Sequence, residues 1–163
     1  MEQENNKGAK APRLVNKRGA ARLAAVQAVY QLEVGGSRVN DVVSEFEVFR
    51  LGQELDGEKY RDADAAWFRD LVQAVFEEQK IIDPKLHSIL SQDWPLKRVD
   101  ATLRSILRVA YAELLRKKDV PAKVIINEFI EITKAFYDQD EPKLVNGLLN
   151  RLARDVRADE FDA

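Results

Sequence analysis

The stretch from Val120 to Leu152 constrains the fold most, because it carries two amphipathic helical patterns separated by an acidic hinge. Apolar residues of the first pattern recur at spacings of four, three and four, which places them on one helix face: Ile125, Phe129, Ile132 and Phe136. After the hinge, Pro142 begins a second helix, whose apolar face is Val145, Leu148, Leu149 and Leu152. Lys143 therefore lies in a first helical turn. Unpaired backbone N–H groups and the positive end of the helix dipole make such a turn able to hold a phosphate.

The same periodicity predicts five earlier helices, at about 16–34, 39–51, 63–80, from Asp83-Pro84 onward, and 96–117. Gly35-Gly36 ends the first of them, Trp94-Pro95 breaks the chain again, and the polar segment 52–62 is predicted to be a loop. The residues predicted to face inward are Gly19, Leu23, Val26 and Tyr30; Val42, Val43, Phe46 and Phe49 or Arg50; Phe68, Leu71, Val72, Val75 and Phe76; Leu86, Ile89 and Leu90; and Leu103, Ile106, Leu107, Ala110 and Leu114.

These patterns predict an all-α protein, a compact seven-helix bundle of two helical subdomains. A chain of 163 residues suffices for one compact domain or two small subdomains that share a core. We expect a flexible basic arm over 1–15, an N-terminal subdomain over 16–80, a C-terminal subdomain over 81–157 and an acidic tail over 158–163. No apolar run approaches the roughly 20 residues of a membrane span, and the charged N-terminus does not fit a secretory signal.

The net charge of −2 hides an uneven distribution. Six basic residues stand against two acidic ones in residues 1–22, whereas the last nine residues hold four acidic residues against Arg157. A basic arm on an acidic body indicates a local surface for anions. A solvated, disordered arm is the alternative.

Residues that could carry catalysis or bind a metal are sparse. His87 is the only histidine and there is no cysteine, which excludes a histidine cluster within one chain and a thiol nucleophile. The standard glycine-rich nucleotide motifs are absent. The hinge from Asp138 to Glu141 lacks the loop of an EF-hand, so we interpret it as a helix-capping segment in which Asp140 or Glu141 caps the next helix. No catalytic residue, metal site or cofactor is expected, and the sequence favours a binding role.

The strongest nucleic-acid signal is divided between two places. Arg18 and Arg22 are four residues apart and so share one helix face, which Lys17 and Arg13 extend into the arm. Lys143 is the second element. Basic groups that hold phosphates and planar groups that stack on bases are typical of single-stranded RNA binding. The alternative is a solvated helix face and a solubilising lysine.

Five segments, in order, resemble the NusB family of bacterial transcription antitermination factors. They are NKRGAARLAAVQAVYQLE at 16–33, WFRDLV at 67–72, LRVAYAEL at 107–114, VPAKVIINE at 120–128 and KLVNG at 143–147. The resemblance covers most of residues 16–155. It implies a helical protein that pairs with the ribosomal protein also called NusE and binds the boxA element of nascent RNA, chiefly in ribosomal RNA operons, within the RNA polymerase antitermination complex. A cytoplasmic location follows from that role.

The resemblance also implies sites. The start of the first helix, with Lys17, Arg18 and Arg22, and Lys143 match positions at which family members contact boxA RNA. Tyr30 matches a tyrosine near the NusE interface, and we expect it to be part core and part interface. Val34, one turn on, and Leu103 are candidates on the same surface, with ordinary packing as the alternative. The chain departs from some relatives in two ways: Leu144 stands where they carry an aromatic residue, and Gly19-Ala20-Ala21 replaces a denser arginine run.

Two alternatives stay open. NusB-like domains also occur at the N-terminus of an RNA cytosine methyltransferase, but we expect no catalytic domain here because the sequence ends shortly after the helical unit. The other alternative is a protein-only interaction module, in which the basic arm serves solubility.

Overall fold

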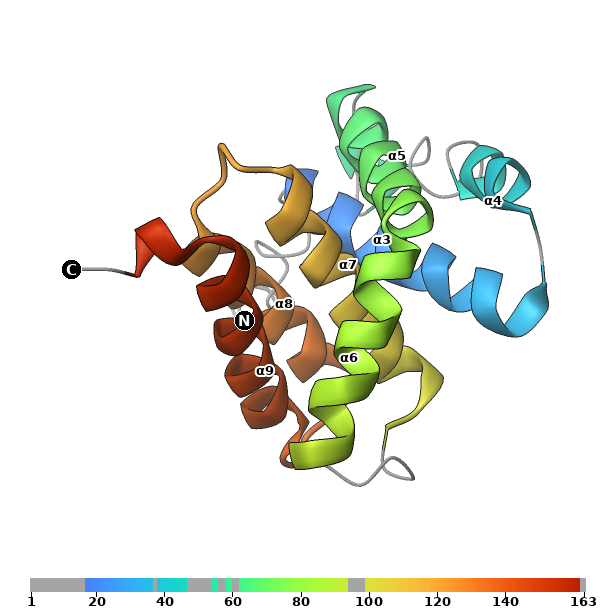
Figure 1. Cartoon of the computed structure of the whole chain (residues 1–163). Helices are drawn as coiled ribbons and strands as arrows, with labels where there is room; N and C mark the ends of the chain where they lie inside the picture. The colour runs from blue at the N-terminus through green and yellow to red at the C-terminus, as the bar shows by residue number, and fades with distance from the viewer. Residues whose placement is uncertain are drawn as a thin grey trace, which may run out of the picture.

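The computed structural model describes residues 17–36, 38–46, 54–55, 58–59, 62–93 and 99–161. Within these ranges it has seven α-helices, one pair of two-residue strands and a terminal 3-10 helix (Figure 1). The all-α class and the seven helices predicted from periodicity are confirmed. In chain order the elements are α3 Lys17–Gly35, α4 Val39–Phe46, β1 Glu54–Leu55, β2 Glu58–Lys59, α5 Asp62–Glu77, α6 Gln79–Asp93, α7 Ala101–Arg116, α8 Ala122–Phe136, α9 Glu141–Val156 and η3 Ala158–Glu160. The predicted arm over 1–15 and the Trp94-Pro95 break lie outside the described residues.

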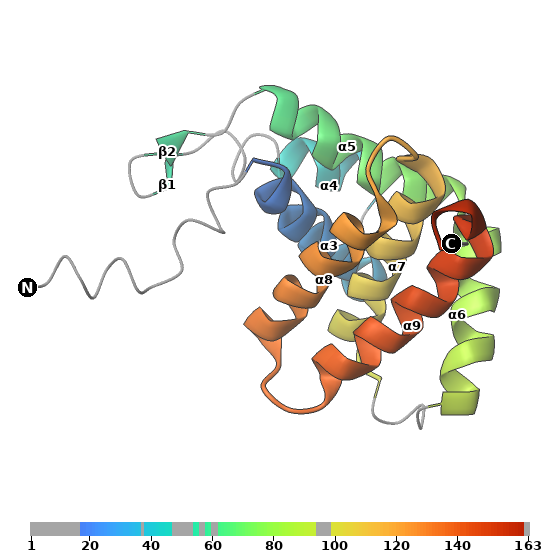
Figure 2. The same ribbon diagram turned by 90° about the vertical axis from the view of Figure 1, so that its left-hand side faces the viewer.

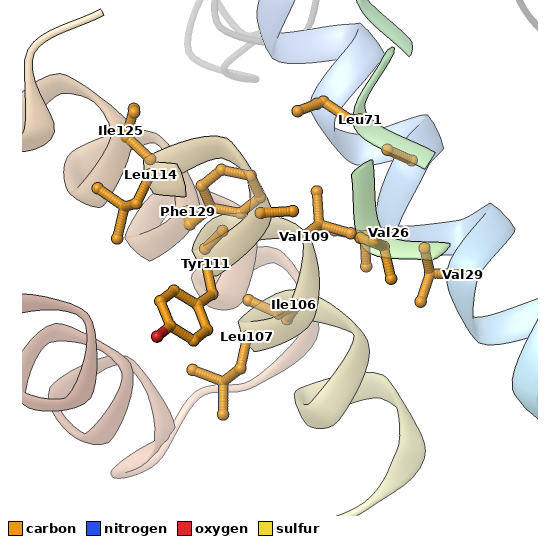
Figure 3. Packing of buried hydrophobic residues seen from close by; sticks show 14 of the residues in the cluster. Val26, Val29, Leu71, Ile106, Leu107, Val109, Tyr111, Leu114, Ile125 and Phe129 are labelled. Carbon is orange, nitrogen blue, oxygen red and sulfur yellow. The ribbon is translucent and has the colours of Figure 1, made fainter. Parts of the chain in front are cut away.

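Helix α7 is the centre of the molecule, and α3, α5, α6, α8 and α9 all contact it. It is buried nearly all round, as expected for a helix that is apolar on most of its faces. Figure 3 shows its residues Ile106, Leu107, Val109, Tyr111 and Leu114 among side chains of α3, α5 and α8. One hydrophobic cluster runs through residues on both sides of position 80, so the two predicted subdomains share a core.

Helix α3 packs through small residues. Its buried positions include Ala21, Ala24, Ala25 and Ala28, and such short side chains let the backbones of neighbouring helices approach closely. The predicted inward stripe was therefore wrong at Tyr30, which is 40% exposed, although Val26 is buried as predicted. Gly36 follows the helix with a φ of +69°, the left-handed conformation that favours glycine at a helix end.

The predicted boundaries fail in two places. Helix α6 begins at Gln79 rather than at Asp83-Pro84, and Pro84 lies inside it. The first turn forms because the N–H groups of Ile81 and Ile82 donate to the carbonyl of Glu78 and Ile82 is fully buried. The predicted loop over 52–62 contains the antiparallel pair of β1 and β2, with Glu54 opposite Lys59.

The α8–α9 pair follows the predicted pattern closely. Ile125, Phe129 and Ile132 are buried on α8, and all four predicted apolar residues of α9 are buried. The pattern was wrong at the last turn of α8, where Phe136 is exposed, and likewise at Phe76 in the last turns of α5. A stripe continues along a helix by spacing alone, whereas its burial ends where the neighbouring helix ends.

The predicted acidic tail is partly structured. Arg157 is buried, and its guanidinium donates to the carbonyls of Leu114, Lys117 and Val120 at 2.8, 2.8 and 3.0 Å. It thereby hydrogen-bonds carbonyls of the last turn of α7 and of the segment that leads into α8. Glu160 of η3 accepts from the N–H of Ala122 at 2.8 Å and so caps α8.

Candidate nucleic-acid interface

The start of α3 presents two exposed cations, Lys17 and Arg18, as the sequence predicted. The guanidinium carbon of Arg18 lies 3.8 Å from the centre of the Trp67 ring, which belongs to α5. Among the described residues no carboxylate forms an ion pair with either cation. Both cations are exposed at this end of α3.

Arg22 does not belong to this exposed face, and its predicted place there was wrong. Its side chain is 3% exposed, and its guanidinium pairs with the buried carboxylate of Glu113 through Nη2 and Oε2 at 2.6 Å. Glu128 of α8 lies 3.7 Å from the same guanidinium. Position 22 falls beside Ala21 and Ala25 on the face that α3 turns to α7, so the arginine needs an internal partner.

Lys143 is exposed in the first turn of α9, again without a carboxylate ion pair among the described residues. Asp140 occupies the N-cap position, but its side chain makes no capping hydrogen bond. The backbone donors of this turn are thus not satisfied by the predicted cap. Leu144 follows the lysine and is half-buried against the hydrophobic core. Its side chain is aliphatic, so it offers no flat ring at this position.

The two basic elements lie on one side of the molecule. In Figure 2 the first turns of α3 and α9 both lie toward the same side, with α8 between them, while α6 lies on the opposite side. Phe136 is the last residue of α8, shortly before Lys143 in the chain, and its ring is exposed. Sequence analysis missed Phe136 as a surface residue because it fits the apolar repeat; only its place in the last turn distinguishes it.

The three residues predicted to contact a protein partner do not form one surface. Tyr30 and Val34 are one turn apart on α3 and are 40% and 56% exposed. Leu103 is fully buried in α7, as the inward-facing pattern predicted, so it is a packing residue and does not lie on a partner surface. It sits in the first turn of α7, where its N–H donates to the Asp100 carboxylate at 3.0 Å, and its side chain points into the core.

An ion-pair network lies next to Tyr30 and Val34. Glu33 accepts from Arg104 and from Arg108, the latter at 2.6 Å, and Arg108 also pairs with Asp83 of α6 at 2.9 Å. Partial burial alone raises the pKa of Glu33, but these hydrogen bonds outweigh it and hold the pKa below its usual value. The network fastens α3 to α7 and α6 and gives the exposed residues a rigid support.

The residues that the structure describes contain no candidate metal site. No group of three or more His, Asp or Glu side chains within them is placed to hold a metal ion. His87 is exposed on α6 and lines a pocket together with Asp83, Arg104 and Arg108. None of the described helices is long and apolar enough to cross a bilayer.

Comparison with known proteins gives a consistent match. Residues 19–154 fit the model of the NusB family. The chain is 56% identical over 147 residues to the transcription antitermination protein NusB of Mesorhizobium japonicum, covering 90% of this chain and 95% of that protein. It is also 56% identical over 152 residues to the protein of the same name in Brucella ovis, covering 93% and 89%.

Solved structures show the same fold. T. maritima NusB matches with a TM-score of 0.72 and 31% identity, covering 90% of this chain and 97% of that chain. A crystal structure of the antitermination factors NusB and NusE in complex with dsRNA matches with a TM-score of 0.68 over 85% of this chain and 97% of the other. The identity there is 21%, so this second match speaks for the fold.

Proposed function

The chain belongs to the NusB family, and we propose from that premise that it is an RNA-binding transcription antitermination factor. It pairs with the ribosomal protein NusE and binds boxA RNA in the transcripts of ribosomal RNA operons, as part of the RNA polymerase antitermination complex. It acts in the cytoplasm, where those transcripts arise, and it works by binding rather than by catalysis. The shared description of its relatives as antitermination proteins supports this role.

The observation that carries RNA binding is the placement of exposed cations at two helix starts on one side of the molecule. Lys17 and Arg18 open α3, and Lys143 lies in the first turn of α9. A helix start adds backbone donors and a positive dipole end to the side-chain charge. A single-stranded RNA that passes over α8 can place a phosphate at each start.

The protein partner is assigned to the exposed part of α3 around Tyr30 and Val34. An aromatic ring and an aliphatic side chain one turn apart offer apolar area, and the charges of Arg104 and Glu33 lie beside them. Interfaces are typically built from such an apolar centre with a polar rim. Leu103 is fully buried and does not belong to this surface.

RNA and NusE then bind to different parts of α3. Since NusE contributes its own RNA-contacting surface in this proposal, the two partners strengthen each other's binding without new chemistry in this chain. Because NusE strengthens RNA binding, the affinity of this chain alone for RNA can be modest.

The test is the affinity of the chain for boxA RNA and for a scrambled RNA of equal length, with and without NusE, at one salt concentration. We expect boxA to bind more tightly than the scrambled RNA and NusE to increase that preference. If NusE binds but neither RNA does, the chain is a protein-only module and the proposal fails.

A further inference from the structure

The ring of Trp67 contacts two cations, one at the start of α3 and one at the end of α7. The guanidinium carbon of Arg18 is 3.8 Å from the ring centre, and Nζ of Lys117 is 4.4 Å from it. These three residues come from α3, α5 and the end of α7, so the ring joins three elements. The ring is only 9% exposed, whereas the side chain of Arg18 is exposed.

The two cations differ in how their charge is balanced. Lys117 donates to the carboxylate of Asp70 at 2.9 Å, so its charge is neutralised within the protein. Arg18 has no carboxylate ion pair among the residues that the structure describes. The indole N–H of Trp67 is buried and has no hydrogen-bond partner within those same residues, so the ring's described polar contacts are with the two cations over it.

A guanidinium carbon at 3.8 Å from a ring centre is at stacking distance. The ring holds the planar group from below and limits its rotamers, so little conformational entropy is lost when a second flat group meets it from solvent. Unpaired RNA bases are recognised by stacking on aromatic rings and on guanidinium planes. Lysine offers the same charge without a plane.

We propose that Arg18, held on Trp67, is a stacking surface for one unpaired RNA base, and that Trp67 is the residue that positions it. The inference rests on the proposed RNA-binding function and deepens it: the start of α3 reads a base face as well as a phosphate. It also places a stacking contact in a chain whose Leu144 cannot provide one.

The first experiment compares Arg18→Lys with the parent protein in binding boxA RNA in the presence of NusE. Loss of one base stack predicts an affinity about 5- to 100-fold lower. The salt dependence of binding should stay unchanged, because the charge is retained. Arg38→Lys, an exposed arginine just before α4, is the matched control and should bind like the parent.

The second measurement uses the ring itself. The chain has two tryptophans, and Trp94→Phe leaves Trp67 as the only one. Binding of boxA RNA should change Trp67 fluorescence in that background. An RNA with abasic positions throughout, which keeps its phosphates, should bind the parent and Arg18→Lys equally well.

The outcomes separate the two proposals. If Arg18→Lys binds boxA as tightly as the parent, the stacking surface is refuted while RNA binding stands. If the parent binds no RNA even with NusE, the proposed function fails and the inference falls with it. Trp67→Phe, which keeps a ring, should bind RNA with an affinity between those of Arg18→Lys and the parent, measured at a temperature where the variant is fully folded.

Discussion

Arg22 of α3 and Glu113 of α7 form a bidentate ion pair inside the protein, with Nε to Oε1 at 2.9 Å and Nη2 to Oε2 at 2.6 Å. Both side chains are almost fully buried. The pair fastens the helix that carries the exposed cations to the central helix of the core. Arg22, which the sequence alone places on a basic surface, thus holds α3 against α7 inside the protein. Its loss should lower the stability of the fold rather than remove a direct RNA contact.

We expect Arg22→Met to lower the free energy of unfolding by about 3–5 kcal/mol, because it leaves the Glu113 carboxylate buried without its partner. Adding Glu113→Leu should recover much of the loss, since two apolar side chains replace the pair. Urea unfolding of both single variants and the double variant measures this. Single variants within about 0.5 kcal/mol of the parent would show that the pair is not needed.

Lys143→Ala should weaken boxA binding and make its salt dependence shallower by about 0.7 in log–log slope, as expected for one lost phosphate contact with a single strand. The melting temperature should barely change, because substitutions of exposed residues usually shift stability by less than about 0.5 kcal/mol. Lys80→Ala, an exposed lysine on α6, is the matched control. Equal slopes for the two variants would place the RNA elsewhere.

Phe129→Ala should cost about 3–5 kcal/mol of stability, since its ring is fully buried against α7. Phe136→Ala, two turns further along the same stripe, should cost far less because that ring is exposed. Thermal and urea unfolding of the pair check the prediction. A similar cost for both would mean that Phe136 also packs in the core.

Val34→Asp should weaken NusE binding about tenfold or more, because it puts a charge at the apolar centre of the proposed interface. Val124→Asp makes the same change at an exposed valine of α8 and should leave NusE binding unaltered. Leu103→Ala should instead lower stability by about 2–5 kcal/mol. Isothermal titration with NusE and unfolding curves distinguish these effects; a Val34→Asp protein that binds NusE like the parent contradicts the assigned surface.

Glu160→Gln should make the protein less sensitive to acid. The N–H of Ala122 and then the guanidinium of Arg157 hydrogen-bond to Glu160 and hold the pKa of its carboxyl below its usual value. Its stabilising contribution is therefore present above the unfolded-state pKa of about 4.3 and is lost as the pH falls through the lower folded-state pKa. Unfolding free energies from pH 6 to pH 2 should fall less in the variant than in the parent, and Asp159→Asn should follow the parent.

Periodicity predicted the helices well because burial in an all-α protein follows the 3.6-residue repeat. It could not find the ends of buried stripes: Phe76 and Phe136 fit the repeat but are exposed in the last turns of their helices. Nor could it show that α6 runs through Pro84, since the burial of Ile82 outweighs one missing hydrogen bond.

The candidate site was predicted only in part, for a similar reason. Lys17, Arg18 and Lys143 are exposed as charge and helix position indicate. Arg22 differs because its partner Glu113 lies 91 residues away, and no local pattern records such a pairing. The support of Arg18 by Trp67 is equally non-local, joining the start of α3 to α5.

The guanidinium of Arg157 has a consequence for the order in which this protein is completed during synthesis. The carbonyls that it satisfies belong to Leu114, Lys117 and Val120, which leave the ribosome some forty residues earlier. Until residue 157 emerges, the end of α7 and the turn into α8 lack their final donor, and α8 lacks the Glu160 cap. The earlier helices can therefore collapse during translation, but the native packing of the core closes only when the last turns of the chain arrive.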